Sequence, residues 1–120
     1  MKSTITFEVD YVRAILFGRQ TAGETHEFIE AVVKCMLEHS CMRVLVWVRS
    51  SRALFTVEKY GISGYFERLR DYPAHRVAML ADSEETRAAQ EYIEVLARQH
   101  ELNVRSFRSE AEAQEWLRGA

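Results

Sequence analysis

Alternating apolar and polar residues at the start of the chain predict a β-hairpin. From residue 5 to residue 9 the sequence reads ITFEV, which has the period of two that is typical of a half-buried strand. Asp10 then marks a tight turn, and Tyr11 to Phe17 (YVRAILF) predicts a second strand. Because the link is short, the two strands should pair in an antiparallel hairpin.

Helical spacing of apolar residues predicts the next element, from Glu24 to about Glu38. One stripe of this helix is formed by residues three and four positions apart, namely Phe28, Ile29, Val32, Val33, Met36 and Leu37. After it, Met42 to Val48 (MRVLVWV) is apolar in both alternating positions. That pattern predicts a central strand that is covered on both faces.

The middle of the chain predicts a weaker second helix from Thr56 to Arg70, with Thr56 as its N-cap. Gly61 and Gly64 each cost about 1 kcal/mol of helix stability relative to Ala, so we expect this helix to be the least rigid element. Val77 to Ala81 (VAMLA) follows as another buried strand.

Two capping-box patterns introduce the last two helices. Asp82 to Glu85 opens a helix that runs to about His100. Asn103 to Phe107 predicts a short final strand, and Ser109 to Glu112 opens the terminal helix. The residues expected to be buried are Ala88, Ala89, Tyr92, Ile93, Val95 and Leu96 in the first of these helices and Ala113, Trp116 and Leu117 in the second.

The element order β-β-α-β-α-β-α-β-α predicts an α/β fold. Strands that alternate with helices favour a mixed, mostly parallel sheet of four to five strands, flanked by about four helices and joined by right-handed crossovers. Only the N-terminal hairpin strand should be antiparallel. We expect one domain over residues 1–120, because no linker, repeat or low-complexity stretch interrupts the pattern.

Composition narrows the classes of function. The 120 residues are 48% hydrophobic, and 16 basic residues are balanced by 18 acidic ones, so a general nucleic-acid binder is not expected. No apolar run approaches the roughly 18 residues of a membrane span. Two cysteines are too few for a disulfide scaffold, and no apolar signal stretch follows Met1. We therefore expect a cytoplasmic protein.

Large apolar residues gather around the predicted second helix and cannot all lie on one of its faces. Some of them should therefore contact solvent, a ligand or a partner chain. The candidate ligand or partner surface consists of Phe55, Tyr60, Ile62, Tyr65 and Phe66.

A second candidate site is a small-anion site at Arg49, Arg52 and Thr56. The N-terminus of a helix presents backbone donors, and nearby arginines would add positive charge. A solvated loop with ordinary arginines is the simpler explanation of the same residues.

Histidine and cysteine positions do not define a catalytic or metal site. Cys35 and His39 lie four residues apart on one helix, but core packing and a favourable helix end explain them without a metal. The four histidines have no nucleophile in a recognised setting nearby. We therefore assign no catalytic residue, metal or cofactor, and do not expect an enzyme.

Several of these segments together resemble the SpoIIAA-like (STAS/SEC14-related) family. The similarity lies in the second strand ending at Gly18, the two-sided strand Val44 to Val48, Phe55-Thr56 at a helix entry, the strand Arg76 to Leu80, and the ending Val104 to Phe107 followed by AQEWL at residues 113–117. The resemblance implies a small mixed sheet flanked by helices that acts as a binding or regulatory module. The phosphorylatable Asp-Ser-Ser-Gly stretch of related anti-sigma-factor antagonists is absent, since residues 50–56 read SSRALFT, so no such phosphoswitch is expected.

Three functions remain open at this point. The first is a non-enzymatic module that works through protein–protein contact or self-association, for example as a homodimer. The second is a carrier of a small hydrophobic, lipid-like ligand, as the SEC14 relatives imply, and the third is a small hydrolase or transferase. A mostly apolar cavity under the second helix would favour the carrier, whereas flat exposed aromatic residues would favour the interface.

Overall fold

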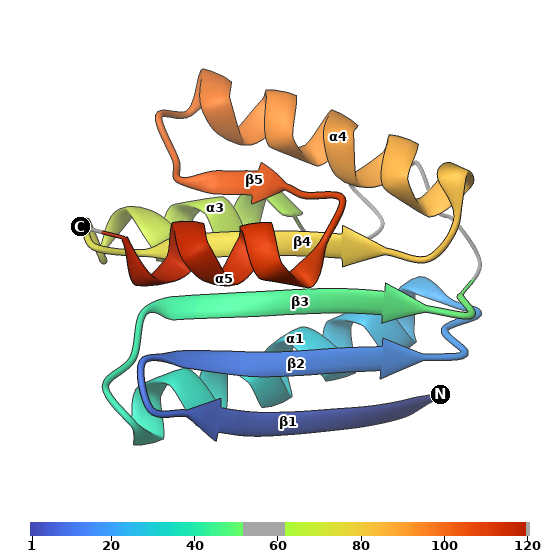
Figure 1. Cartoon of the computed structure of the whole chain (residues 1–120), viewed down its shortest axis with the longest axis horizontal. Coiled ribbons are helices and arrows are strands. Elements are labelled where there is room, and N and C mark those ends of the chain that lie inside the picture. Colours follow the sequence, from blue (N-terminus) through green and yellow to red (C-terminus); the bar gives the residue numbers. More distant parts are fainter. Residues whose placement is uncertain (52–61, 120) are drawn as a thin grey trace.

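The computed structural model describes residues 1–51 and 62–119, which form five strands and four helices around one mixed sheet (Figure 1). The α/β class and the mixed, mostly parallel sheet are as predicted. In chain order the elements are β1 (Lys2–Glu8), β2 (Tyr11–Phe17), α1 (Ala22–Glu38), β3 (Arg43–Arg49), α3 (Ile62–Arg70), β4 (Arg76–Ala81), α4 (Glu84–Gln99), β5 (Val104–Ser106) and α5 (Glu110–Arg118).

The strands lie in the sheet in the order in which they occur in the chain, β1-β2-β3-β4-β5. β1 pairs with β2 in an antiparallel hairpin, and β2 to β5 are parallel to one another. Crossovers between parallel neighbours are right-handed, so a sheet built in sequential order places its crossover helices on one face. Accordingly α1, α3 and α4 share one face, and α5 lies on the other (Figure 1).

Alternation along the strands divides the core between the two faces. On β4, Val77 and Met79 pack towards α3 and α4, whereas Ala78 and Leu80 pack against α5. The core under α1 consists mainly of Val12, Ala14, Leu16, Phe28, Val32, Met36 and Val44.

The terminal helix is anchored by Leu117, which is fully buried together with Ala113 against Leu45 and the even-numbered residues of β4. Its neighbour Trp116, expected to be a buried anchor, is only half-buried. The Trp116 ring lies 5.5 Å from the ring of Phe107 and under the guanidinium groups of two arginines. Leu117 is therefore the anchor of α5, and Trp116 lies at its margin.

The prediction of which residues α4 buries is partly wrong. Tyr92 and Val95 are 51% and 48% exposed, and Ala88 is also exposed. Towards the sheet the helix turns Ala89 and Ile93, as predicted, together with the small and polar residues Thr86, Gln90 and Ala97, all at three- and four-residue spacing. Leu37, assigned to the apolar stripe of α1, is likewise 52% exposed.

Element boundaries also differ from the predictions at several ends. α1 begins at Ala22 rather than Glu24, because Thr21 and Glu24 form a capping box that the apolar pattern does not reveal. β5 comprises only Val104–Ser106. The described part of the second predicted helix is α3, and residues 56–61 of that prediction lie outside the described residues.

None of the described helices is both long enough and apolar enough to span a membrane.

The burial of α5 predicts unequal effects for its two large apolar residues. Leu117→Ala should lower the free energy of unfolding by about 2–5 kcal/mol, the range for a fully buried leucine. Trp116→Ala should cost less, because part of that ring is already in water. Urea unfolding of both variants tests this order, and a larger loss in Trp116→Ala would show that the ring, not Leu117, anchors the helix.

Candidate functional site

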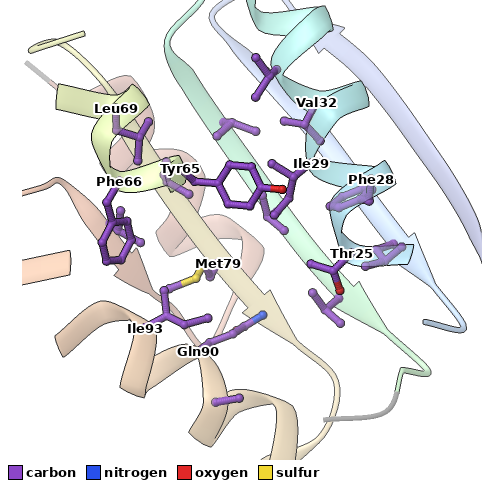
Figure 2. A pocket seen from close by; sticks show the side chains of 18 of the residues that line it. Thr25, Phe28, Ile29, Val32, Tyr65, Phe66, Leu69, Met79, Gln90 and Ile93 are labelled. Atoms are coloured by element: carbon purple, nitrogen blue, oxygen red, sulfur yellow. The ribbon is translucent and has the colours of Figure 1, made fainter. Parts of the chain in front are cut away.

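A cavity of about 200 Å³ lies between the sheet and the three helices that cover one of its faces (Figure 2). β3 and β4 form its floor, α1 and α4 its sides, and α3 overlies it. Its surface is almost entirely apolar, and the side chains that line it include Ile29, Val32, Val46, Leu69, Met79 and Ile93.

α3 is the shortest of the three helices on this face, and it contributes Tyr65, Phe66 and Leu69 to the cavity lining. Phe66 is buried and packs in a cluster with Met79 of β4 and residues near β5. Among residues 64–70, Phe66 is the one buried side chain. Over residues 64–70, the apolar contacts of the helix are therefore made largely by one aromatic ring and two half-buried residues, Tyr65 and Leu69.

Two polar contacts connect α3 with α1. The Tyr65 hydroxyl lies 2.7 Å from Nδ1 of His26, and Arg68 forms an ion pair with Glu30 at 2.8 Å. Burial raises the pKa of the Tyr65 phenol, and the neighbouring Glu30 carboxylate acts in the same direction. Tyr65 therefore stays protonated, so its phenol can donate a hydrogen bond to the His26 ring.

Two of the five residues predicted for the ligand or partner surface, Tyr65 and Phe66, line this cavity. The side chain of Ile62, together with Phe55 and Tyr60, lies outside the described residues. The described aromatic rings of α3 thus point into the molecule, towards the space beneath the helix, rather than forming a flat exposed patch (Figure 2).

Polar side chains also line the cavity, and sequence analysis did not single them out. Arg19, Thr25, Thr86 and Gln90 are all more than nine-tenths buried. The signal was present in the helical spacing, since Thr86 and Gln90 fall on the same stripe as Ala89 and Ala97. A search for apolar stripes passes over such residues because it assigns polar positions to the solvent side.

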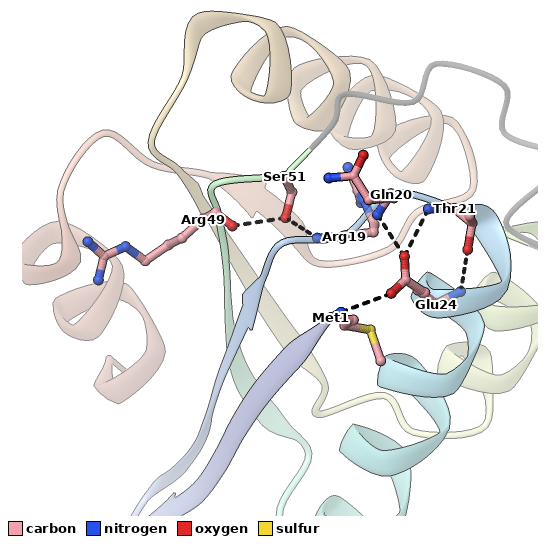
Figure 3. A network of polar contacts seen from close by, with 7 residues as sticks. All are labelled: Met1, Arg19, Gln20, Thr21, Glu24, Arg49 and Ser51. Carbon is pink, nitrogen blue, oxygen red and sulfur yellow. Dashed lines mark hydrogen bonds and ion pairs between the residues drawn. The ribbon is translucent and has the colours of Figure 1, made fainter.

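A network of polar contacts fixes the end of the molecule where β2 and β3 finish and α1 begins (Figure 3). The Thr21 hydroxyl accepts from the backbone N–H of Glu24 at 3.2 Å, and the Glu24 carboxylate accepts from the N–H groups of Thr21 and Gln20 at 3.1 and 2.8 Å. The Ser51 hydroxyl accepts from the Arg19 N–H at 3.0 Å and donates to the Arg49 carbonyl at 2.9 Å. The capping box sets the first turn of α1, which presents Thr25 to the cavity.

The predicted anion site is represented by a single described residue, Arg49. Its guanidinium lies over the rings of Trp47 and Phe17, at 5.0 and 5.3 Å from their centroids. These rings belong to the face of the sheet opposite the cavity. Arg52 and Thr56, the other two members, lie outside the described residues.

Cys35 and His39 lie together as their spacing predicted, with Sγ 3.7 Å from Nδ1, and the Phe7 ring stacks on the His39 ring. Burial raises the pKa of the Cys35 thiol, and the Glu38 carboxylate adds to this effect. Within residues 1–51 and 62–119, no three His, Cys, Asp or Glu side chains converge in a way that could hold a metal ion.

Comparison of the chain with models of known families, with curated proteins and with solved structures finds no match. The chemistry of the cavity and of its lining residues is therefore the basis on which a function can be assigned.

The weak attachment of α3 predicts that it is the least stable of the described helices. Gly64 has no positive φ, and a Cβ atom there would meet no heavy atom within 4 Å, so Gly64→Ala should stabilise the protein by about 0.4–1 kcal/mol. Hydrogen exchange should be faster at amides 66–70 than at Val77–Leu80, and the alanine variant should slow it in α3. Equal protection of both segments in the unmodified chain would contradict this assignment.

The capping box predicts a dependence of stability on pH that is specific to Glu24. Backbone N–H donation, above all from Gln20, lowers the pKa of the Glu24 carboxyl below its usual 4.5. A lowered pKa in the folded state stabilises the protein above pH 4.5, and this stabilisation is lost as the pH falls through the folded value. Thermal melts at a series of pH values should therefore show that the melting temperature falls less below pH 4.5 in Glu24→Gln than in the unmodified protein. An equal fall of the melting temperature in both proteins would contradict the prediction.

Proposed function

We propose that this chain is a SpoIIAA-like binding module that holds a small, mostly apolar ligand between the sheet and α1, α3 and α4. The observation that carries the proposal is the cavity itself. Protein interiors rarely contain voids larger than a water molecule, whereas this pocket has a volume of about 200 Å³ and an almost wholly apolar surface. A bound apolar ligand would remove that surface from water and gain dispersion contacts with the lining side chains.

The size of the cavity favours a compact ligand. Drug-sized ligands occupy pockets of about 300–1,000 Å³, whereas an apolar cavity of about 150 Å³ binds benzene. At about 200 Å³ the cavity fits a single ring or a short alkyl chain rather than a complete membrane lipid. The proposal therefore takes the ligand-carrier alternative of the resemblance and restricts it to small molecules.

The protein–protein alternative has less support at the residues first assigned to it. Phe66 is buried and Tyr65 is half-buried against His26, so neither offers a free apolar surface to a partner. Exposed apolar side chains occur elsewhere: Val9, at the tip of the hairpin, is the most exposed of them at 89%, and Phe7 near it is 40% exposed. Self-association therefore remains a second candidate, through that tip rather than through α3.

Filling the cavity tests the proposal. Val33→Phe places a phenyl ring at a half-buried position of the cavity wall, and Val95→Phe makes the same change at an exposed position of α4 that does not line it. 1-Octanol at about 100 times its Kd should stabilise the unmodified protein and Val95→Phe by about 2.7 kcal/mol, and Val33→Phe much less.

Native mass spectrometry of the protein purified from cells provides the second readout, since a retained small molecule would appear as added mass. Stabilisation by 1-octanol that is equal in Val33→Phe and Val95→Phe would mean that the probe binds outside the cavity, and would overturn the proposal.

A further inference from the structure

We infer that the ligand carries an uncharged hydrogen-bond donor, a hydroxyl group in the simplest case, which donates to Oε1 of Gln90 and lies beside the hydroxyl of Thr25. The inference rests on the proposed function, because it assigns the chemistry of the group held at one end of the same cavity. The two polar atoms concerned are buried in the cavity wall and have no hydrogen-bond partner among the described residues.

Gln90 supplies an acceptor with a fixed orientation. Its Nε2 donates to the Leu80 carbonyl oxygen at 2.8 Å, which determines which end of the amide is the oxygen. The residue is 5% exposed, and Oε1 is left without a donor in the described part of the chain. A buried acceptor that lacks a partner is unfavourable, so a ligand that donates to Oε1 gains binding energy there.

Thr25 supplies the second polar atom, from α1. The residue is 6% exposed, and its Oγ1 also has no partner among the described residues. Figure 2 shows Thr25 and Gln90 on the two helices that flank the cavity, both towards the ends of the strand arrows. Because a hydroxyl both donates and accepts, Thr25 can hydrogen-bond to the oxygen of a ligand hydroxyl whose proton is directed to Gln90.

The same residues disfavour an anionic group. A carboxylate has only acceptor atoms, so it would repel Oε1 of Gln90 rather than satisfy it. Arg19 also brings a buried positive charge to the cavity lining, so octanoate measures whether the attraction of that charge outweighs the repulsion from Oε1. The other end of the cavity is apolar and includes Met36 and Leu69, which fits the hydrocarbon part of an alcohol.

Three probes of similar size separate these possibilities: 1-octanol, 1-methoxyheptane, which keeps the oxygen but lacks the donor, and octanoate. Their affinities can be measured by NMR titration of ¹⁵N-labelled protein. We expect 1-octanol to bind about threefold to tenfold more tightly than the ether, the contribution of one neutral hydrogen bond. Octanoate should bind more weakly than both.

Thr25→Val tests the second polar atom, because it removes the hydroxyl and keeps the shape of the side chain. It should weaken 1-octanol and the ether alike, since the oxygen of either probe can accept from Thr25, while its melting temperature stays the same or rises. Ile29→Val is the matched control in the same helix, since it trims an apolar wall position and should weaken both probes with a lower melting temperature. A lower melting temperature with unchanged affinity for both probes in Thr25→Val would show a structural role and overturn the assignment of Thr25.

Gln90→Met is the decisive variant for the acceptor and should abolish the preference for 1-octanol over the ether. Equal affinities of the two probes for the unmodified protein, or tightest binding of octanoate, would overturn the donor assignment and leave the apolar cavity as proposed. Failure of all three probes to bind would instead remove the proposed function, and the inference with it.

Discussion

The difference in width between helices and strands governs this fold. Neighbouring strands lie about 4.8 Å apart, whereas a helix with its side chains is about 10 Å across. Strands in sequential order place α1, α3 and α4 on one face. Measured between axes, three helices side by side need about 20 Å, whereas the four parallel strands span about 14 Å. α1 also extends over β1, and α3, the shortest of the three helices as described, lies between α1 and α4 (Figure 1). The cavity lies beneath that middle helix.

The apolar cavity and the polar atoms in its wall that lack a partner among the described residues each lower the stability of the protein, and the proposed ligand would offset both effects. An unfilled apolar space loses dispersion contacts, and an unpartnered buried acceptor such as Oε1 of Gln90 loses its hydrogen bond to water. Both losses occur on the three-helix face, between the ends of α1 and α4 that the caps at Thr21 and Ser83 fix. Over residues 64–70, α3 has one buried side chain, so among the described helices it is the one that the proposed ligand would displace most easily.

Periodicity was sufficient to predict the element order and the sheet type, because strands and helices that bury one face carry apolar residues with periods of two and 3.6. It was insufficient for the cavity, whose polar lining residues lie on buried stripes. Tyr92 and Val95 were placed inside because they are apolar, yet the sheet side of α4 carries Thr86 and Gln90. Of the predicted surface, Tyr65 and Phe66 line the cavity, because an excess of large apolar residues on one short helix cannot all fit its core face.

The opposite face shows the other consequence of the same asymmetry. Only one of the described helices, α5, lies on that face, where it packs on β3 and β4 and reaches β2 through side-chain contacts with Tyr11 and Arg13. The rings of Trp47 and Phe17 lie under arginine side chains instead, with the Arg13 guanidinium 5.7 Å and that of Arg49 5.0 Å from the Trp47 ring. Long arginine side chains can cover apolar surface while their charged ends stay hydrated or paired, as Arg13 is with Glu110 at 3.0 Å. The arginine that suggested an anion site therefore has a structural explanation: it covers aromatic rings on the face where the topology places one helix instead of three.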